Sequence, residues 1–142
     1  MKISLYLLAA WGVAAIAPAA ATQQPVRPVP GVTMVFFGWD RPDVDRDGAA
    51  SLDDAASAYL QSPGAVISIE GHSDRSGPSG ANLEASRRRA ETVRTYLAGR
   101  GVPMASMRVS AYGEQRPLIA TADGVREPQN RRVDVRINAS AN

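Results

Sequence analysis

Residues 70 to 96 contain an acidic and a basic side chain that together could bind a small zwitterion. Asp74 falls in a Gly- and Ser-rich stretch after an alternating apolar run, and Arg89 falls in the long helical pattern that follows. A carboxylate can bind an ammonium group, while a guanidinium can bind a carboxylate through two parallel hydrogen bonds. A strand end, a polar loop and a helix start would hold these two charges on a stiff framework.

The helical pattern over residues 82–100 decides which of its charged residues can face that loop. Its apolar stripe has helical spacing and consists of Leu83, Ser86, Ala90, Val93 and Leu97. At about 100° per residue, Asn82 and Arg89 lie on the same flank of this stripe, while Arg88 points to water. The alternative for Arg89 is an ordinary exposed ion pair worth at most about 1 kcal/mol, and the alternative for Asp74 is a turn residue.

A spaced motif runs through this stretch and is made of Gly71, His72, Ser73, Asp74, Asn82, Ser86, Arg89 and Ala90. Further matching residues are Tyr112, Gly113, Glu114 and Pro117, followed by Asn130, Arg131, Arg132 and Val133. In residue type, spacing and order, this pattern resembles the OmpA-like C-terminal domain shared by OmpA, the Pal lipoproteins and the flagellar MotB stators. The resemblance covers residues 32 to 138.

The resemblance implies a binding function and no enzymatic activity, cofactor or metal. The expected ligand is peptidoglycan, bound non-covalently through the diaminopimelate of its stem peptide. Asp74 would receive the ammonium of that residue and Arg89 its carboxylate, with Asn82 and backbone N–H groups completing the pocket. Arg131 is expected to brace the pocket from the last strand, and Ser73 completes the set of expected ligand-binding residues.

Two other functions remain open from the sequence. One is a periplasmic interaction protein that keeps the fold without binding murein. The other is a hydrolase acting on cell-wall peptide, for which Glu70, Asp74 and Glu114 are the available carboxylates. A triad of His72 with its two successors is excluded, because consecutive side chains of an extended segment diverge. His72 is therefore expected to be structural.

The amino-acid composition excludes several other classes of protein and of functional site. A chain of 142 residues with 44% hydrophobic content has room for one domain beyond a targeting segment. The absence of cysteine excludes disulfides and thiol catalysis, and one histidine excludes a multi-histidine metal site. The net charge of +2 is small and no aromatic residues alternate with the basic ones, so nucleic-acid binding is not indicated.

The first 31 residues are expected to be a targeting segment followed by a tether. Residues 1–21 have a basic start, an apolar run and small residues near Ala21, which is typical of a signal peptide. An uncleaved membrane anchor is the alternative. Residues 22–31 contain three prolines and predict an extended tether. Without a cysteine there is no site for a lipid anchor. The protein is therefore expected in the periplasm, where the outer membrane, the cell wall and an envelope protein are candidate contacts.

Residues 32–138 are expected to form a small α/β sandwich, in which two helices pack on one face of a mixed four-strand sheet. Alternating or β-branched runs predict strands over residues 32–39, 65–70, 107–111 and 131–138. The last run should point Val133, Val135 and Ile137 inward and Arg132, Asp134 and Arg136 outward, as suits an edge strand.

The segment from Asp43 to Asp54 resembles a calcium loop, because its acids follow D-x-D-x-D-G and end with an acid at the twelfth position. Against calcium, the eighth position is Ala50 and a strand, not a helix, precedes the segment. The alternative is a solvated acidic loop. In that case Ser51, Asp53 and Asp54 would cap a helix over residues 52–61.

Overall fold

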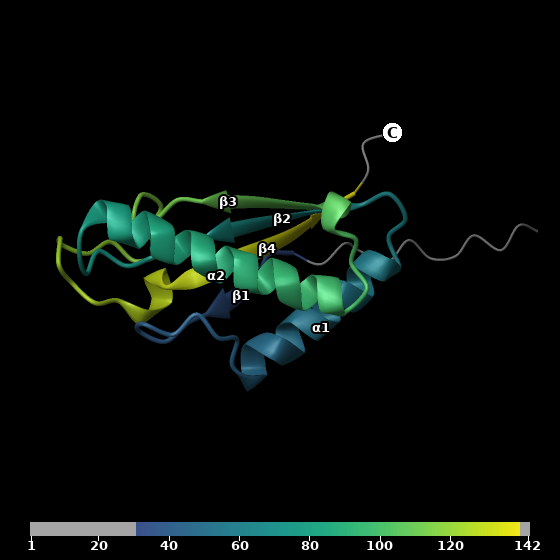
Figure 1. The fold of residues 1–142 in the computed structure, drawn as a ribbon, viewed down its shortest axis with the longest axis horizontal. Helices are drawn as coiled ribbons and strands as arrows, with labels where there is room; N and C mark the ends of the chain where they lie inside the picture. Colours follow the sequence, from purple (N-terminus) through teal and green to yellow (C-terminus); the bar gives the residue numbers. More distant parts are fainter. Residues whose placement is uncertain (1–30, 140–142) are drawn as a thin grey trace, which may run out of the picture.

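Two long helices and four strands make up residues 31–139, which are the residues described by the computed structural model (Figure 1). In chain order these elements are β1 Thr33–Phe36, α1 Arg46–Leu60, β2 Val66–Gly71, α2 Ser79–Gly99, β3 Met107–Ala111 and β4 Arg132–Asn138. Short 3-10 helices cover Met104–Ser106 and Pro128–Asn130. The expected signal peptide and all of the tether except Gly31 lie outside the described residues. Within those residues no helix is long and apolar enough to cross a membrane.

The four strands form one mixed sheet in the order β1-β4-β2-β3. The β1–β4 and β4–β2 pairs are antiparallel, and the β2–β3 pair is parallel. The edge position expected for the last strand is therefore wrong, because β4 lies between β1 and β2. Arg132 and Asp134 do point away from the helices, but both are buried instead of solvated. A central strand tolerates them because they pair with each other, with the Arg132 Nε atom 3.0 Å from Asp134 Oδ1.

Both helices cover the same face of the sheet (Figure 1). The core between the layers consists mainly of aliphatic side chains, including Leu52, Ile67, Ile69, Val93, Leu97, Val133 and Val135. The strand members of this set fall on alternate positions, as a half-buried sheet requires. The two-layer α/β architecture expected from the sequence is confirmed.

Helix α1 begins at Arg46, well before the expected start near Leu52. Its N-cap is Asp45, whose carboxylate accepts a hydrogen bond of 2.8 Å from the backbone N–H of Gly48. The expected capping by Ser51, Asp53 and Asp54 is wrong, since all three lie inside the helix. Because residues 46–54 are helical, their carboxylates do not wrap around a point as the ligands of a calcium loop do.

Helix α2 begins at Ser79 and approaches β2 very closely at Gly71. A Cβ built on Gly71 would lie 2.1 Å from the backbone oxygen of Ser86, so only glycine permits this packing. The buried face of α2 follows the expected stripe except at Leu83, which is 39% exposed. The contact at Gly71 places the first turns of α2 over the loop that follows β2.

Candidate ligand-binding site

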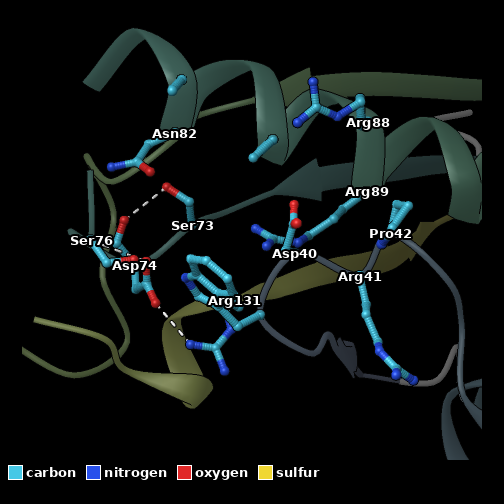
Figure 2. Close-up of a pocket in the computed structure, with 13 residues that line it drawn as sticks. Asp40, Arg41, Pro42, Ser73, Asp74, Ser76, Asn82, Arg88, Arg89 and Arg131 are labelled. Carbon is cyan, nitrogen blue, oxygen red and sulfur yellow. Dashed lines mark hydrogen bonds and ion pairs between the residues drawn. The ribbon is translucent and has the colours of Figure 1, made fainter. Parts of the chain in front are cut away.

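A polar cavity of about 340 Å³ opens where the loops after β1 and β2 meet the first turns of α2 (Figure 2). All five ligand-binding residues expected from the sequence line it, namely Ser73, Asp74, Asn82, Arg89 and Arg131. Its other lining residues are Trp39, Asp40, Arg41, Pro42, Ser76, Ala81, Ala85 and Arg88. The expected acid and base thus face one common space from separate elements.

Asp74 is a buried carboxylate that is hydrogen-bonded on both oxygens. Its Oδ1 atom accepts from the backbone N–H of Ser76 at 3.2 Å and from the Ser76 hydroxyl at 2.5 Å. Its Oδ2 atom accepts from the backbone N–H of Glu127 at 3.2 Å and from Arg131 Nη1 at 2.8 Å. Burial raises the pKa of Asp74, but the hydrogen bonds from Ser76, Arg131 and Glu127 outweigh burial and hold it below its usual value of 3.8. Asp74 therefore carries a fixed negative charge.

Arg131 holds the Asp74 side chain in place from the residue immediately before β4. Besides the ion pair with Asp74, its Nε atom donates a hydrogen bond of 3.2 Å to the backbone oxygen of Phe37. Arg131 thus links the loop after β2 to the chain that leaves β1. A bracing role was expected from the sequence, and this geometry suits it.

Arg89 is a buried guanidinium without a carboxylate partner in the described part of the chain. Only 6% of the residue is exposed. Within residues 31–139 its one hydrogen bond runs from Nη1 to the backbone oxygen of His72, at 3.3 Å, and it forms no ion pair. Burial and the nearby Arg131 charge lower the pKa of Arg89, while Asp74 acts in the opposite direction. A guanidinium nevertheless stays protonated, so the cavity contains a positive charge that its surroundings only partly compensate.

Asn82 is fixed by its amide nitrogen, which donates to Glu114 Oε2 at 2.6 Å and to the backbone oxygen of Gly77 at 3.2 Å. Both amide N–H groups are thus used, so the Asn82 carbonyl oxygen remains as an acceptor for a ligand. Ser73 is held by its backbone N–H, which donates to the backbone oxygen of Gly113 at 2.8 Å. The Ser73 hydroxyl donates to the backbone oxygen of Asp74 at 3.1 Å.

The loop after β1 supplies cavity residues that the sequence did not assign to the site. Asp40 adopts a left-handed backbone conformation with φ of 53°, which aspartate tolerates better than most residues. Neighbouring Trp39 is half exposed, and the Arg126 guanidinium lies 4.0 Å from its ring centroid. Arg88 was expected to point to water, and although exposed it also lines the cavity. The sequence offers one indication that this loop belongs to the site, because the loop directly follows a strand expected beside the site.

The charges around the cavity favour ligands with carboxylate groups. Four arginines line the cavity, against two aspartates, and one of those aspartates is already paired with Arg131. This charge distribution suits a ligand carboxylate, and the aspartates beside the arginines suit an ammonium group. The His72 ring belongs to the opposite face of the sheet, where it stacks on Tyr112 with ring centroids 5.6 Å apart.

Sequence comparisons match the chain to one family. The model of the OmpA family matches residues 36–131. An outer membrane protein of Gluconacetobacter diazotrophicus is 39% identical over 115 residues, which cover 76% of this chain and 30% of that protein. The peptidoglycan-associated lipoprotein of Haemophilus influenzae is 36% identical over 99 residues, covering 69% of this chain and 64% of that protein. The chain thus spans less than two thirds of each of these relatives.

Solved structures agree with the sequence comparison. The crystal structure of the peptidoglycan-associated lipoprotein from Burkholderia pseudomallei superposes with a TM-score of 0.69 at 32% identity, covering 75% of this chain and 90% of that chain. The periplasmic domain of Helicobacter pylori MotB (residues 78–256) superposes with a TM-score of 0.62 at 20% identity, covering 75% of this chain and 71% of that chain. At 20% identity, the similarity to MotB shows a shared fold and nothing more. The family match and the sequence relatives together show that this chain belongs to the OmpA family.

Proposed function

We propose that this protein binds peptidoglycan non-covalently, through the diaminopimelate residue of the stem peptide. Its relatives are outer membrane and peptidoglycan-associated proteins, and it is accordingly a protein of the cell envelope. The far end of diaminopimelate carries a free carboxylate and a free ammonium group. The observation that carries the proposal is Arg89, a buried cation on a cavity wall with no carboxylate partner among the described residues.

A ligand carboxylate would supply the partner that Arg89 lacks. An isolated charge in a low-dielectric site is unfavourable unless it is paired. The guanidinium also has more N–H donors than its single bond to His72 uses, so it can bind a carboxylate through two parallel hydrogen bonds. The other cavity arginines add to the attraction. We therefore assign the ligand carboxylate to Arg89.

The ammonium group of the ligand would lie on the side of Asp74. The Asp74 carboxylate already accepts four hydrogen bonds, and the Ser76 hydroxyl is the one of these donors that can rotate away. An ammonium would replace that hydroxyl at Oδ1, while Arg131 keeps Oδ2 in place. The carbonyl oxygen of Asn82 offers a second, neutral acceptor. In this arrangement Asp74 supplies the negative charge that binds the ammonium group, and Arg131 fixes the orientation of the Asp74 carboxylate.

Binding is favoured over hydrolysis because the carboxylates available for catalysis do not converge. Glu70 groups with His72 and Asp134, away from the cavity. Asp74 is held as an anion by its four hydrogen bonds, and Glu114 accepts a hydrogen bond from Asn82. A pair of carboxylates in acid and base roles needs a shared reacting atom. Of Glu70, Asp74 and Glu114, only Asp74 lines the cavity.

Sedimentation with purified sacculi tests the proposal. The protein should pellet with sacculi, and Arg89→Ala and Asp74→Ala should shift it to the supernatant. A matched control is Arg87→Ala, since Arg87 lies on the same helix but is exposed and pairs with Glu84 at 3.7 Å. That variant should pellet as the wild type does. If the wild type stays in the supernatant, the proposal fails and a scaffold function is favoured. Release of soluble wall fragments during the assay would instead indicate a hydrolase.

A further inference from the structure

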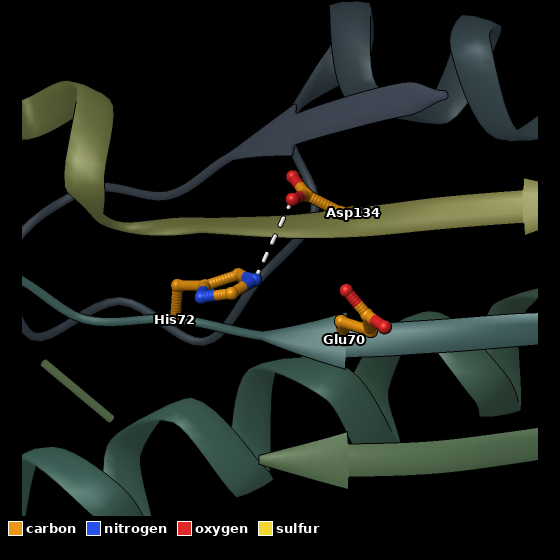
Figure 3. Close-up of side chains that lie close together, drawn as sticks. All are labelled: Glu70, His72 and Asp134. Carbon is orange, nitrogen blue, oxygen red and sulfur yellow. Dashed lines mark ion pairs between the residues drawn. The ribbon is translucent and has the colours of Figure 1, made fainter. Parts of the chain in front are cut away.

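A cluster of three ionisable side chains lies on the face of the sheet that the helices leave uncovered (Figure 3). Glu70 on β2 and Asp134 on β4 are direct partners in the antiparallel register, so their side chains share one face. His72 lies two residues beyond Glu70 and points to the same face. One ligand atom from each of the three residues lies within 4.8 Å of the other two.

The His72 ring is buried and lacks a hydrogen bond on either nitrogen. The residue is 1% exposed, and neither Nδ1 nor Nε2 has a hydrogen-bond partner. Nε2 points toward Asp134, but the distance to Oδ2 is 3.5 Å, longer than an ordinary N–H···O bond (Figure 3). Stacking on Tyr112 fixes the plane of the ring. Apart from this long contact with Asp134, the imidazole nitrogens have no polar partner among residues 31–139, and a buried polar group is unfavourable unless something binds it.

The charges of the cluster also leave room for a cation. Arg132 pairs with both oxygens of Asp134, with Nε at 3.0 Å from Oδ1 and Nη2 at 3.4 Å from Oδ2, and so orients this carboxylate with Oδ2 toward His72. Glu70 is half-buried, and its side chain forms no hydrogen bond or ion pair among residues 31–139. Two carboxylates directly across a strand pair repel each other. Arg132 pairs with Asp134, whereas the Glu70 carboxylate forms no ion pair among the described residues, although Arg108 and Arg136 lie on the same face one register step away.

We propose that Glu70, His72 and Asp134 bind a divalent transition-metal ion such as Zn²⁺. His72 Nε2, Asp134 Oδ2 and a Glu70 carboxylate oxygen would be the protein ligands, with water in the remaining position. Mixed imidazole and carboxylate ligands suit zinc and copper, whereas calcium and magnesium prefer oxygen alone.

The existing geometry is close to what such an ion needs. Zn–N and Zn–O bonds of about 2.0–2.2 Å place neighbouring ligand atoms roughly 3.5 Å apart. The separation of His72 Nε2 and Asp134 Oδ2 already has this value. The wider separations, up to 4.8 Å, can close by rotation of the Glu70 side chain, which is the most accessible of the three. Arg132 would then act as an outer-shell partner of the Asp134 ligand.

Zinc titration of the purified protein tests this site without needing a variant, because the chain contains one histidine and no cysteine. NMR signals of the single imidazole should shift on addition of Zn²⁺ and reach saturation at one equivalent. A parallel calorimetric titration should give one site. Unshifted ring signals in excess Zn²⁺ would overturn the proposal, whatever the behaviour of any variant.

Variants test which carboxylate takes part. Glu70→Gln keeps the size of a half-buried side chain and should weaken zinc binding on the order of tenfold or more. Glu84→Gln is the matched control, because Glu84 is an exposed glutamate of α2 that lies outside the cluster. Because Glu70 does not line the peptidoglycan cavity, Glu70→Gln should still pellet with sacculi as the wild type does, so this test is independent of the peptidoglycan proposal. Equal zinc affinity of Glu70→Gln and the wild type would contradict the assigned ligand set.

Discussion

Arg131 Nη1 lies 2.8 Å from Asp74 Oδ2, in a buried ion pair that joins residues 57 positions apart in the chain. This pair neutralises the buried acid of the cavity, whereas the buried Arg89 forms no ion pair among residues 31–139. The site therefore combines Asp74, an anion held by an ion pair, with Arg89, a buried cation that has no carboxylate partner among the described residues. This asymmetry decides which substitutions should affect binding and which should affect stability.

Arg89→Met should weaken binding to sacculi without lowering the free energy of unfolding. The substitution removes the ligand contact, but it also removes a buried charge and replaces it with an apolar side chain of similar length. Loss of a charge-assisted contact should weaken binding roughly tenfold to hundredfold. Urea unfolding and sacculus sedimentation of the same preparation measure the two effects. A variant that unfolds at much lower urea concentration would show that Arg89 is needed for the fold.

Substitution of either Asp74 or Arg131 alone should destabilise the fold, because each leaves the other charge buried and unpaired. Asp74→Asn and Arg131→Met are each expected to lower the free energy of unfolding by up to about 3–5 kcal/mol. The double variant should lose less than the sum of the two single effects. A double-mutant cycle from urea unfolding curves measures the difference. Additive losses would mean that the two side chains do not interact in solution.

The stability gained from Asp74 should depend on pH in the acidic range. The folded-state pKa of Asp74 lies below its ordinary value of 3.8. Its contribution is therefore present above pH 3.8 and is lost as the pH falls below 3.8 through the folded-state pKa. The stability difference between the wild type and Asp74→Asn should accordingly shrink on acidification below pH 3.8. Unfolding curves at stepwise lower pH measure this, and a constant difference would contradict the assigned ionisation.

Gly71→Ala should strongly destabilise the protein and also weaken ligand binding. The added Cβ would lie 2.1 Å from the Ser86 backbone oxygen and would push α2, with Asn82 and Arg89, away from β2. Gly80→Ala is the matched control, since Gly80 lies in α2 with open space around it. It should stabilise the helix by roughly 0.5–1 kcal/mol. Thermal melting of both variants measures the contrast. Equal melting temperatures would show that α2 and β2 are not in close contact.

Local patterns were sufficient to predict the elements and one flank of the site. The alternation of Ile67 and Ile69 predicted β2, and the seven-residue separation of Asn82 and Arg89 placed both on one side of α2. The structure has both residues on the cavity. These relationships depend on the periods of a strand and a helix, which a sequence shows directly.

Relationships between distant segments were not accessible in the same way. Nothing local to β4 shows that it pairs with both β1 and β2, so its central position was missed. Likewise, Asp45 could be predicted as the N-cap only if the start of α1 was known. Trp39 and Asp40 could be assigned to the cavity only if the path of the loop after β1 was known. The grouping of His72 with Asp134 depends on the strand register, which the sequence does not specify.

The most direct test of the central claim is a calorimetric titration with two stem peptides that differ at one residue. One carries diaminopimelate and the other carries lysine, which has the ammonium group but lacks the terminal carboxylate. The account predicts that the diaminopimelate peptide binds at least about tenfold more tightly, since Arg89 pairs with that carboxylate, and that Arg89→Met removes the difference. Equal affinity of the wild type for the two peptides would contradict it.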